Sequence, residues 1–125
     1  MTKARAIGQN LLRRPTHWDH GNRLHWGHAI LGEVALAEGR PDAARAHLLS
    51  AGRSPGSPQL NSFGPDMRLA SKFLRQGNVE PVVEYLKLCE HFWASGRGEI
   101  GKWIEEIGLG RQPMLPSHSQ EPWVP

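Results

Sequence analysis

The sequence predicts an all-α domain built around two helical hairpins, and three observations predict it. Apolar residues recur at helical spacing on both sides of a Gly39-Arg40-Pro41 break within residues 31–51. The same pattern returns 38 residues later, around Gly77. Residues 79–93 are apolar on so many sides that a helix there should be central in the domain.

The first hairpin follows from its turn. Gly39 suits the left-handed C-cap of a helix over residues 23–38, and Pro41 suits the first turn of a helix over residues 41–51. Neither helix can bury its apolar face alone, so the two should pack on each other and on a further element. Gly32 should allow close approach of a neighbouring backbone, which offsets the cost of about 1 kcal/mol of a helical glycine.

The remaining elements follow from helix stops and periodicity. The connection over residues 52–65 is rich in Pro, Gly and Asn and is expected to be a loop. Beyond Gly110 the chain loses periodicity and carries four prolines, so residues 111–125 should form an extended or disordered tail to a single domain over residues 1–110. The further helices expected are 2–14, 66–76, 79–93 and a capping helix around 100–107.

Two sets of residues resemble a known family. The first is Leu31, Gly32, Gly39, Ala44, Leu48 and Ala51, and the second is Leu69, Ala70, Phe73, Gly77, Val82, Leu86 and Cys89. Their spacing resembles the tetratricopeptide (TPR) helix-turn-helix repeat, with His28 where that repeat usually has Trp. Because that family repeats every ~34 residues, about four extra residues should lie in the connection. The chain is also similar to short bacterial TPR-like proteins, and the resemblance implies a non-catalytic module that binds a protein segment.

Composition and charge limit the class of protein. The chain of 125 residues has one Cys, which excludes an internal disulfide and fits a reducing compartment, so we expect a cytoplasmic protein. No apolar run approaches the ~20 residues that cross a bilayer, so no membrane partner is expected. The net charge of +3 divides into a basic N-terminal end and an acidic stretch over residues 80–106. A nucleic-acid partner is disfavoured, because it would require a basic stripe interleaved with aromatic residues.

The predicted binding groove lies on the first helix of each pair, where basic residues and one aromatic residue gather. Arg68, Lys72 and Arg75 should form one ridge, because they are four and three residues apart on one helix. Like charges so close repel each other unless acids offset them, and Asp66 is the acid nearby in sequence. An acidic or carboxylate-bearing partner is therefore predicted, although each residue taken singly also fits an ordinary exposed position. The candidate groove residues are Asn22, Arg23, Trp26, Glu33, Arg68, Ser71, Lys72 and Arg75.

A group of histidines suggests an alternative site. Asp19, His20, His25 and His28 could converge at a helix start and hold zinc or nickel. The competing interpretation places His28 in the core as a substitute for the aromatic residue of the repeat. The spacing lacks the His-Glu-x-x-His pattern of a metalloprotease, and no Cys pair supports a structural zinc.

The favoured function is thus a protein- or peptide-binding scaffold without a cofactor. The alternative is a small metal-binding protein or a metal-dependent hydrolase that uses residues 17–28. No nucleophile is marked by a local motif and no phosphate-binding glycine loop is present in the sequence. Two repeats leave an apolar edge, so self-association is a further expectation.

Overall fold

The chain forms a stack of helices. The computed structural model describes residues 2–13 and 20–116, and helices are the only regular elements in this part, which confirms the all-α prediction. No helix described there is both long and apolar enough to cross a bilayer. In chain order the elements are α1 (Thr2–Leu12), α2 (His20–Ala37), α3 (Pro41–Gly52), α4 (Pro58–Phe63), α5 (Arg68–Arg75), α6 (Val79–Cys89), the 3-10 helix η1 (Ala94–Gly96) and α7 (Arg97–Gly108).

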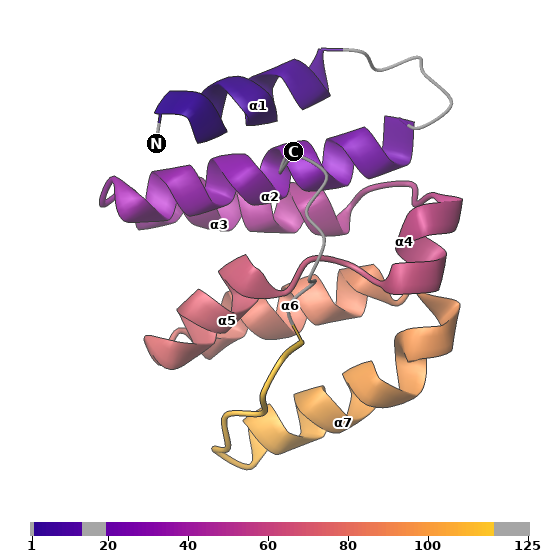
Figure 1. Cartoon of the computed structure of the whole chain (residues 1–125). Coiled ribbons are helices and arrows are strands. Elements are labelled where there is room, and N and C mark those ends of the chain that lie inside the picture. The colour runs from indigo at the N-terminus through magenta and orange to yellow at the C-terminus, as the bar shows by residue number, and fades with distance from the viewer. Residues whose placement is uncertain (1, 14–19, 117–125) are drawn as a thin grey trace.

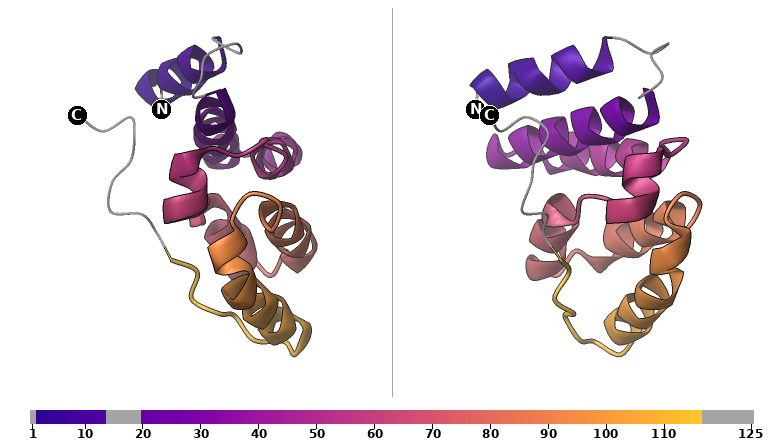
Figure 2. Two further views of the ribbon diagram at one scale, coloured as in Figure 1. Left: turned by 90° about the vertical axis from the view of Figure 1, so that its right-hand side faces the viewer. Right: turned by 45° about the vertical axis from the view of Figure 1, so that its right-hand side comes forward.

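Two helix pairs form the centre of the stack (Figure 1). α2 packs on α3 and α5 packs on α6, while α3 also contacts α6 and α2 contacts α5. Seen along the helices, α2 and α5 make one layer, and α3 and α6 make the other (Figure 2). α1 covers α2 at one end of the stack and α7 packs on α6 at the other.

The two helix pairs have the same type of turn. Gly39 and Gly77 both adopt positive φ, at 75° and 78°, as expected for glycine caps. In the first turn the N–H of Gly39 donates to the carbonyl of Leu36, and that of Arg40 donates to Ala35. This is the Schellman arrangement, which satisfies carbonyls left over at a helix end. The second turn has the same two bonds 38 residues later: Gly77 to Leu74 and Asn78 to Phe73.

The second helices of the two pairs bury the same positions. Each of these side chains is at most 2% exposed, so the sequence repeat corresponds to equivalent places in the core. At two of the three equivalent positions, α3 has a smaller residue than α6. The equivalent pairs are Ala44 and Val82, Leu48 and Leu86, and Ala51 and Cys89.

Gly32 lets α2 fit closely between its neighbours, but the two nearest atoms belong to side chains and not to the backbone that the sequence analysis expected. A Cβ atom on Gly32 would lie 2.3 Å from Cδ2 of Leu69 on α5 and 3.2 Å from Cβ of His47 on α3. Real Cβ atoms essentially never approach another heavy atom within 3.0 Å. A side chain at this position would therefore push apart helices that pack through their faces.

The connection between the pairs corrects the sequence analysis, because it contains the short helix α4. Ser57 caps this helix: its Oγ accepts a hydrogen bond of 3.0 Å from the N–H of Leu60. Pro58 follows in the first turn, where its fixed φ is favourable. Leu60 is 1% exposed and holds the connection against the core.

Helix boundaries also differ from expectation, most clearly at α6. The helix ends at Cys89, not at residue 93. The chain turns there, which brings Phe92 into the core and stacks the ring of Trp93 on Trp103 of α7, with 6.2 Å between centroids. α7 buries Ile100, Trp103 and Ile107, so its predicted apolar face packs on the body. Elsewhere α1 ends at Leu12, α2 begins at His20 and α5 begins at Arg68.

The packed body extends past Gly110. Residues 111–116 form no helix or strand, and they return to the helices. Gln112 Nε2 donates a 3.0 Å hydrogen bond to the carbonyl of Leu74 near the end of α5. Leu115 is 7% exposed and belongs to the hydrophobic core cluster. The prediction for residues 117–125 lies outside the described residues.

Candidate functional site

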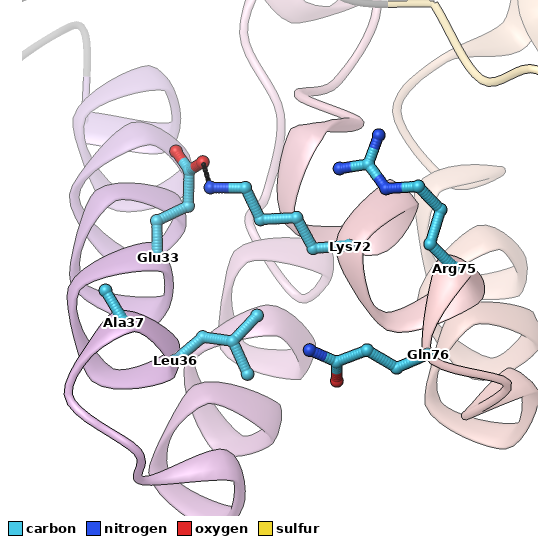
Figure 3. A pocket seen from close by; sticks show the side chains of 6 residues that line it. All are labelled: Glu33, Leu36, Ala37, Lys72, Arg75 and Gln76. Carbon is cyan, nitrogen blue, oxygen red and sulfur yellow. Dashed lines mark hydrogen bonds and ion pairs between the residues drawn. The ribbon is translucent and has the colours of Figure 1, made fainter.

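A cavity of about 320 Å³ opens between α2 and α5. Figure 3 shows that the two helices face each other across it, with charged side chains at one end and apolar ones near the other. α2 contributes one carboxylate and an apolar floor, while α5 and its C-cap contribute two cations and an amide. The lining residues are Glu33, Leu36, Ala37, Lys72, Arg75 and Gln76.

An ion pair closes one side of the cavity. Lys72 Nζ lies 2.8 Å from Oε1 of Glu33, so the pair ties α5 to α2. The Glu33 side chain is 17% exposed and that of Lys72 43%, so water reaches the lysine more freely. Pairs as accessible as this contribute little to stability, typically below ~1 kcal/mol, but they do fix the position of the ammonium group.

Arg75 is the second cation of the cavity, and it differs from Lys72 in having no ion pair in the described part of the chain. Its side chain is exposed and lines the cavity. Within residues 2–13 and 20–116, no hydrogen bond or ion pair to its guanidinium is found. The guanidinium fork matches a carboxylate through two parallel N–H donors. The cavity therefore combines one available cation with the apolar side chains of Leu36 and Ala37.

The basic ridge predicted on α5 needs a correction. The chain itself offsets two of its three charges: Lys72 pairs with Glu33, and Arg68 Nε lies 3.0 Å from Oδ1 of Asp66. The acid that the sequence analysis missed is Glu33, which is 39 residues from Lys72 and is brought close only by the packing of α2 on α5. Arg75 is the one ridge residue without an ion pair or hydrogen bond among the described residues.

Three of the eight predicted groove residues line this cavity: Glu33, Lys72 and Arg75. Trp26 is 6% exposed and its ring lies edge-on to that of His25, with 5.6 Å between centroids. Arg23 lies on the side of α2 that α1 covers, and it donates a hydrogen bond to the carbonyl of Asn10 in α1. Arg68, Ser71 and Asn22 are partly buried and are not lining residues. Leu36, Ala37 and Gln76 were missed, although each lies about one turn beyond Glu33 or Lys72.

Of the residues in the metal alternative, His25 and His28 are described, and they bond to different partners. His25 is fully buried and uses both ring nitrogens: Nδ1 lies 3.0 Å from the carbonyl of Ala51, and Nε2 accepts a 2.9 Å hydrogen bond from the N–H of Asp66. These two bonds fix the neutral ring with its proton on Nδ1. Asp19 and the side chain of His20 lie outside the described residues. In the described part of the chain, no group of three metal-ligating side chains forms.

His28 turns instead toward α3. Its Nδ1 lies 2.9 Å from Nδ1 of His47, so the N–H of one ring donates a hydrogen bond to the nitrogen of the other. Partial burial, together with the neighbouring His47 and His25, lowers the pKa of His28 to about 4. Partial burial and the charge of Arg40 also lower the pKa of His47. Both rings are therefore neutral near pH 7, and the pair acts as a hydrogen bond between α2 and α3.

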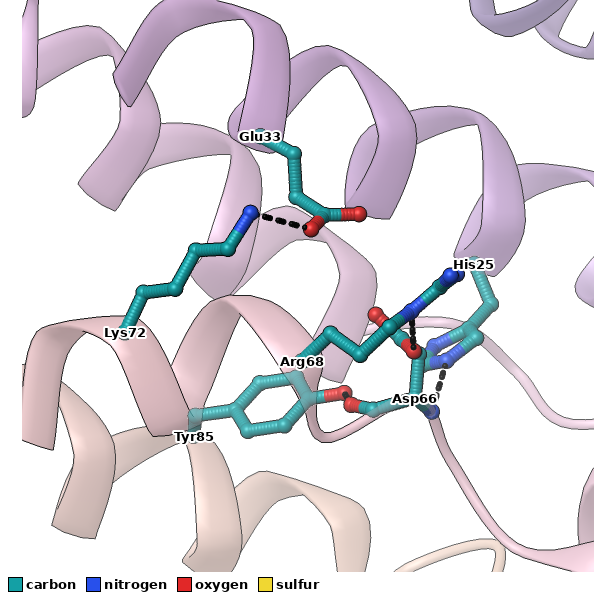
Figure 4. A network of polar contacts seen from close by, with 6 residues as sticks. All are labelled: His25, Glu33, Asp66, Arg68, Lys72 and Tyr85. Carbon is teal, nitrogen blue, oxygen red and sulfur yellow. Dashed lines mark hydrogen bonds and ion pairs between the residues drawn. The ribbon is translucent and has the colours of Figure 1, made fainter. Parts of the chain in front are cut away.

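Asp66 is the centre of a buried polar network that orients α5 against α2 (Figure 4). Its N–H donates to His25, its side chain accepts from Arg68, and its carbonyl accepts a 2.5 Å bond from the Tyr85 hydroxyl of α6. Burial raises the pKa of Tyr85 well above its ordinary value, so the phenol stays protonated and remains a donor. The network thus joins α2, α3, α5 and α6 beside the cavity and holds its walls in place.

Comparison with known proteins does not extend the assignment. No protein family, no curated protein and no solved structure matches this chain. Any functional conclusion therefore rests on the geometry of the cavity and on the arrangement of the two helix pairs.

Proposed function

We propose that this chain is a non-catalytic, TPR-like scaffold that binds an acidic protein or peptide segment in the cavity between α2 and α5. The observation that carries the proposal is the exposed guanidinium of Arg75, which has no partner among the described residues and lines the same cavity as the apolar side chains of Leu36 and Ala37. An available cation and apolar surface in one cavity suit a ligand that has both a carboxylate and an apolar side chain.

The TPR-like interpretation is supported by the likeness of the two hairpins. Both end their first helix in a Schellman turn at a glycine with positive φ, and both bury the same three positions of their second helix. The first helices, α2 and α5, then lie side by side and leave a cavity between them, as the repeat family implies.

The chemistry of the lining suggests how a peptide would lie. Arg75 would hold a carboxylate bidentately, and Leu36 and Ala37 would receive an apolar side chain. Gln76 has both an amide donor and an acceptor, which suits the backbone of an extended segment. The Lys72–Glu33 pair would limit the cavity on the side opposite Gln76 and so favour one orientation of the peptide.

The single cysteine agrees with the proposed cytoplasmic location. Cys89 is fully buried, and burial raises the pKa of its thiol, so it is packed as an inert core residue. A thiol in a reducing compartment needs no disulfide partner.

Selection from a random peptide library tests the proposal. We expect enrichment of sequences with Asp or Glu beside an apolar residue, because those two groups match the cavity. Binding of the best fluorescent peptide should weaken at least about tenfold, or 1.4 kcal/mol, in Arg75→Glu. It should also weaken in salt, because the cavity is open to water.

Lys87→Glu is the matched control. Lys87 is an exposed cation in the last turn of α6, as Arg75 is in the last turn of α5, but it does not line the cavity. Arg75 is preferred to Lys72 for the test, since reversal of Lys72 would also break the ion pair to Glu33. No enrichment of acidic peptides, or equal binding by Arg75→Glu and the wild type, would disprove the proposal.

A further inference from the structure

The C-terminal segment passes beside the cavity. Gln112 donates to the carbonyl of Leu74, the residue before Arg75. That carbonyl also accepts the N–H of Gly77, so the segment attaches where α5 ends and the cavity is lined. Figure 2 shows residues 111–116 on the side of the α2 and α5 layer, away from α3 and α6. The buried side chain of Leu115 fixes this course.

The next nine residues, 117–125, carry the groups that the cavity suits. An extended chain of that length spans at most about 30 Å. Its sequence, SHSQEPWVP, has one acidic side chain, Glu121, and two large apolar side chains, Trp123 and Val124. In an extended strand Glu121 and Trp123 project to the same side, because residues i and i+2 share a face.

We propose that residues 117–125 bind in the α2–α5 cavity of their own chain, with Glu121 on Arg75 and Trp123 against Leu36 and Ala37. This inference rests on the proposed function, since it assigns an internal occupant to the same site. Charge complementarity and the anchored course of residues 111–116 support it. A peptide partner then has to displace this segment before it binds.

The consequence for affinity follows from the tether. A short tether gives its end an effective concentration in the millimolar range. A segment whose dissociation constant lies well below this value would then occupy the cavity for most of the time. The measured affinity for an added peptide falls in proportion to the fraction of cavities left open.

Paramagnetic labelling of the full chain tests the placement. A nitroxide on Val124→Cys is site-specific, because the native Cys89 is buried and burial raises the pKa of its thiol. We expect selective loss of the amide signals of residues 33–37 and 72–76. The loss should disappear in Arg75→Glu, persist in Lys87→Glu and return in the charge-swapped Arg75→Glu/Glu121→Arg chain.

Signal loss spread over the surface, loss centred elsewhere, or loss that persists unchanged in Arg75→Glu would overturn the inference. A second measurement uses the fluorescent peptide selected on the cavity. Its affinity for the full chain should rise about tenfold or more in Glu121→Lys, given a tethered competitor. Gln120→Lys, which makes a similar change on the opposite side of an extended strand, should leave the affinity near wild type.

The two proposals fail separately. If the peptide binds through Arg75 but Glu121→Lys changes nothing, the tail inference is wrong and the proposed function remains. If the nitroxide reports docking but no added acidic peptide binds to any variant, including Glu121→Lys, the cavity serves the tail alone and the proposed function is wrong.

Discussion

Replacement of Gly32 by alanine tests the packing that creates the cavity. The new Cβ would lie 2.3 Å from Cδ2 of Leu69, which is 1% exposed and has little room to move. It would also lie 3.2 Å from Cβ of His47, closer than most Cβ contacts. Overpacking of this kind costs about 1–3 kcal/mol. The higher helix propensity of alanine offsets about 1 kcal/mol of this overpacking cost.

Gly101→Ala provides the control, because a Cβ at that exposed position of α7 would meet nothing within 4 Å. It should stabilise the protein by about 0.5–1 kcal/mol through helix propensity alone. The two variants should then differ by about 1–3 kcal/mol in the free energy of unfolding, measured in urea. This corresponds to a difference of roughly 4–12 °C in melting temperature for a domain of this size. Equal stabilisation by both substitutions would refute the close contact among α2, α3 and α5.

Three further predictions concern the histidines and the buried network. Because the folded state lowers the pKa of His28 from 6.5 to about 4, it binds fewer protons than the unfolded state between these values, so stability should fall as pH drops from 6.5 to 4. After a discount for solvent screening of this half-buried pair, the free energy of unfolding should fall by about 1–2 kcal/mol. Urea unfolding at several pH values should show this fall in the wild type and a smaller one in His28→Leu. The same pH dependence in both proteins would contradict the lowered pKa of His28. His25→Leu should lower the free energy of unfolding by about 2–5 kcal/mol, because it leaves the Ala51 carbonyl and the Asp66 N–H unpaired. The control His91→Leu, at an exposed position, should lower it little. Similar losses in both variants would mean that His25 does not bridge these groups. Tyr85→Phe should cost about 1–2 kcal/mol in the same assay through loss of the bond to Asp66, and no cost would show that this bond is absent.

Features set by neighbours in sequence were predictable. The turns at Gly39 and Gly77 were predictable, because a glycine between two helical patterns is a local signal for a helix end with positive φ. The apolar faces of α3 and α6 follow from helical spacing, and the repeat positions named on them are buried: Ala44, Leu48, Ala51, Val82, Leu86 and Cys89. The α4 helix could also have been found, because Ser57 followed by Pro58 is a local cap signal.

Features set by tertiary contacts were not predictable. Glu33 meets Lys72 across 39 residues, and His25 meets Asp66 across 41. No local pattern specifies such pairs, because they depend on how α2 and α5 are oriented by the whole stack. For the same reason, the histidines that are close in sequence separate in space: His25 faces the network around Asp66, while His28 faces His47.

The end of α6 shows how packing overrides periodicity. Residues 79–93 have a continuous apolar pattern, yet the helix stops at Cys89. Phe92 and Trp93 instead contact the α4 connection, and Trp93 also stacks on Trp103 of α7. A Cβ on Gly56 would lie 2.6 Å from Cβ of Phe92, and one on Gly64 would lie 2.8 Å from the Trp93 ring. These contacts involve distant glycines, so helical spacing alone could not predict them.

Chemical-shift mapping of the selected acidic peptide on the isotopically labelled full chain tests the central claim most directly. The largest shift changes should fall on Leu36, Ala37, Arg75 and Gln76, together with the Nε–H signal of Arg75. They should be absent in Arg75→Glu and retained in Lys87→Glu. Shift changes that leave these four residues untouched while the peptide binds would contradict the assignment of the cavity as the binding site.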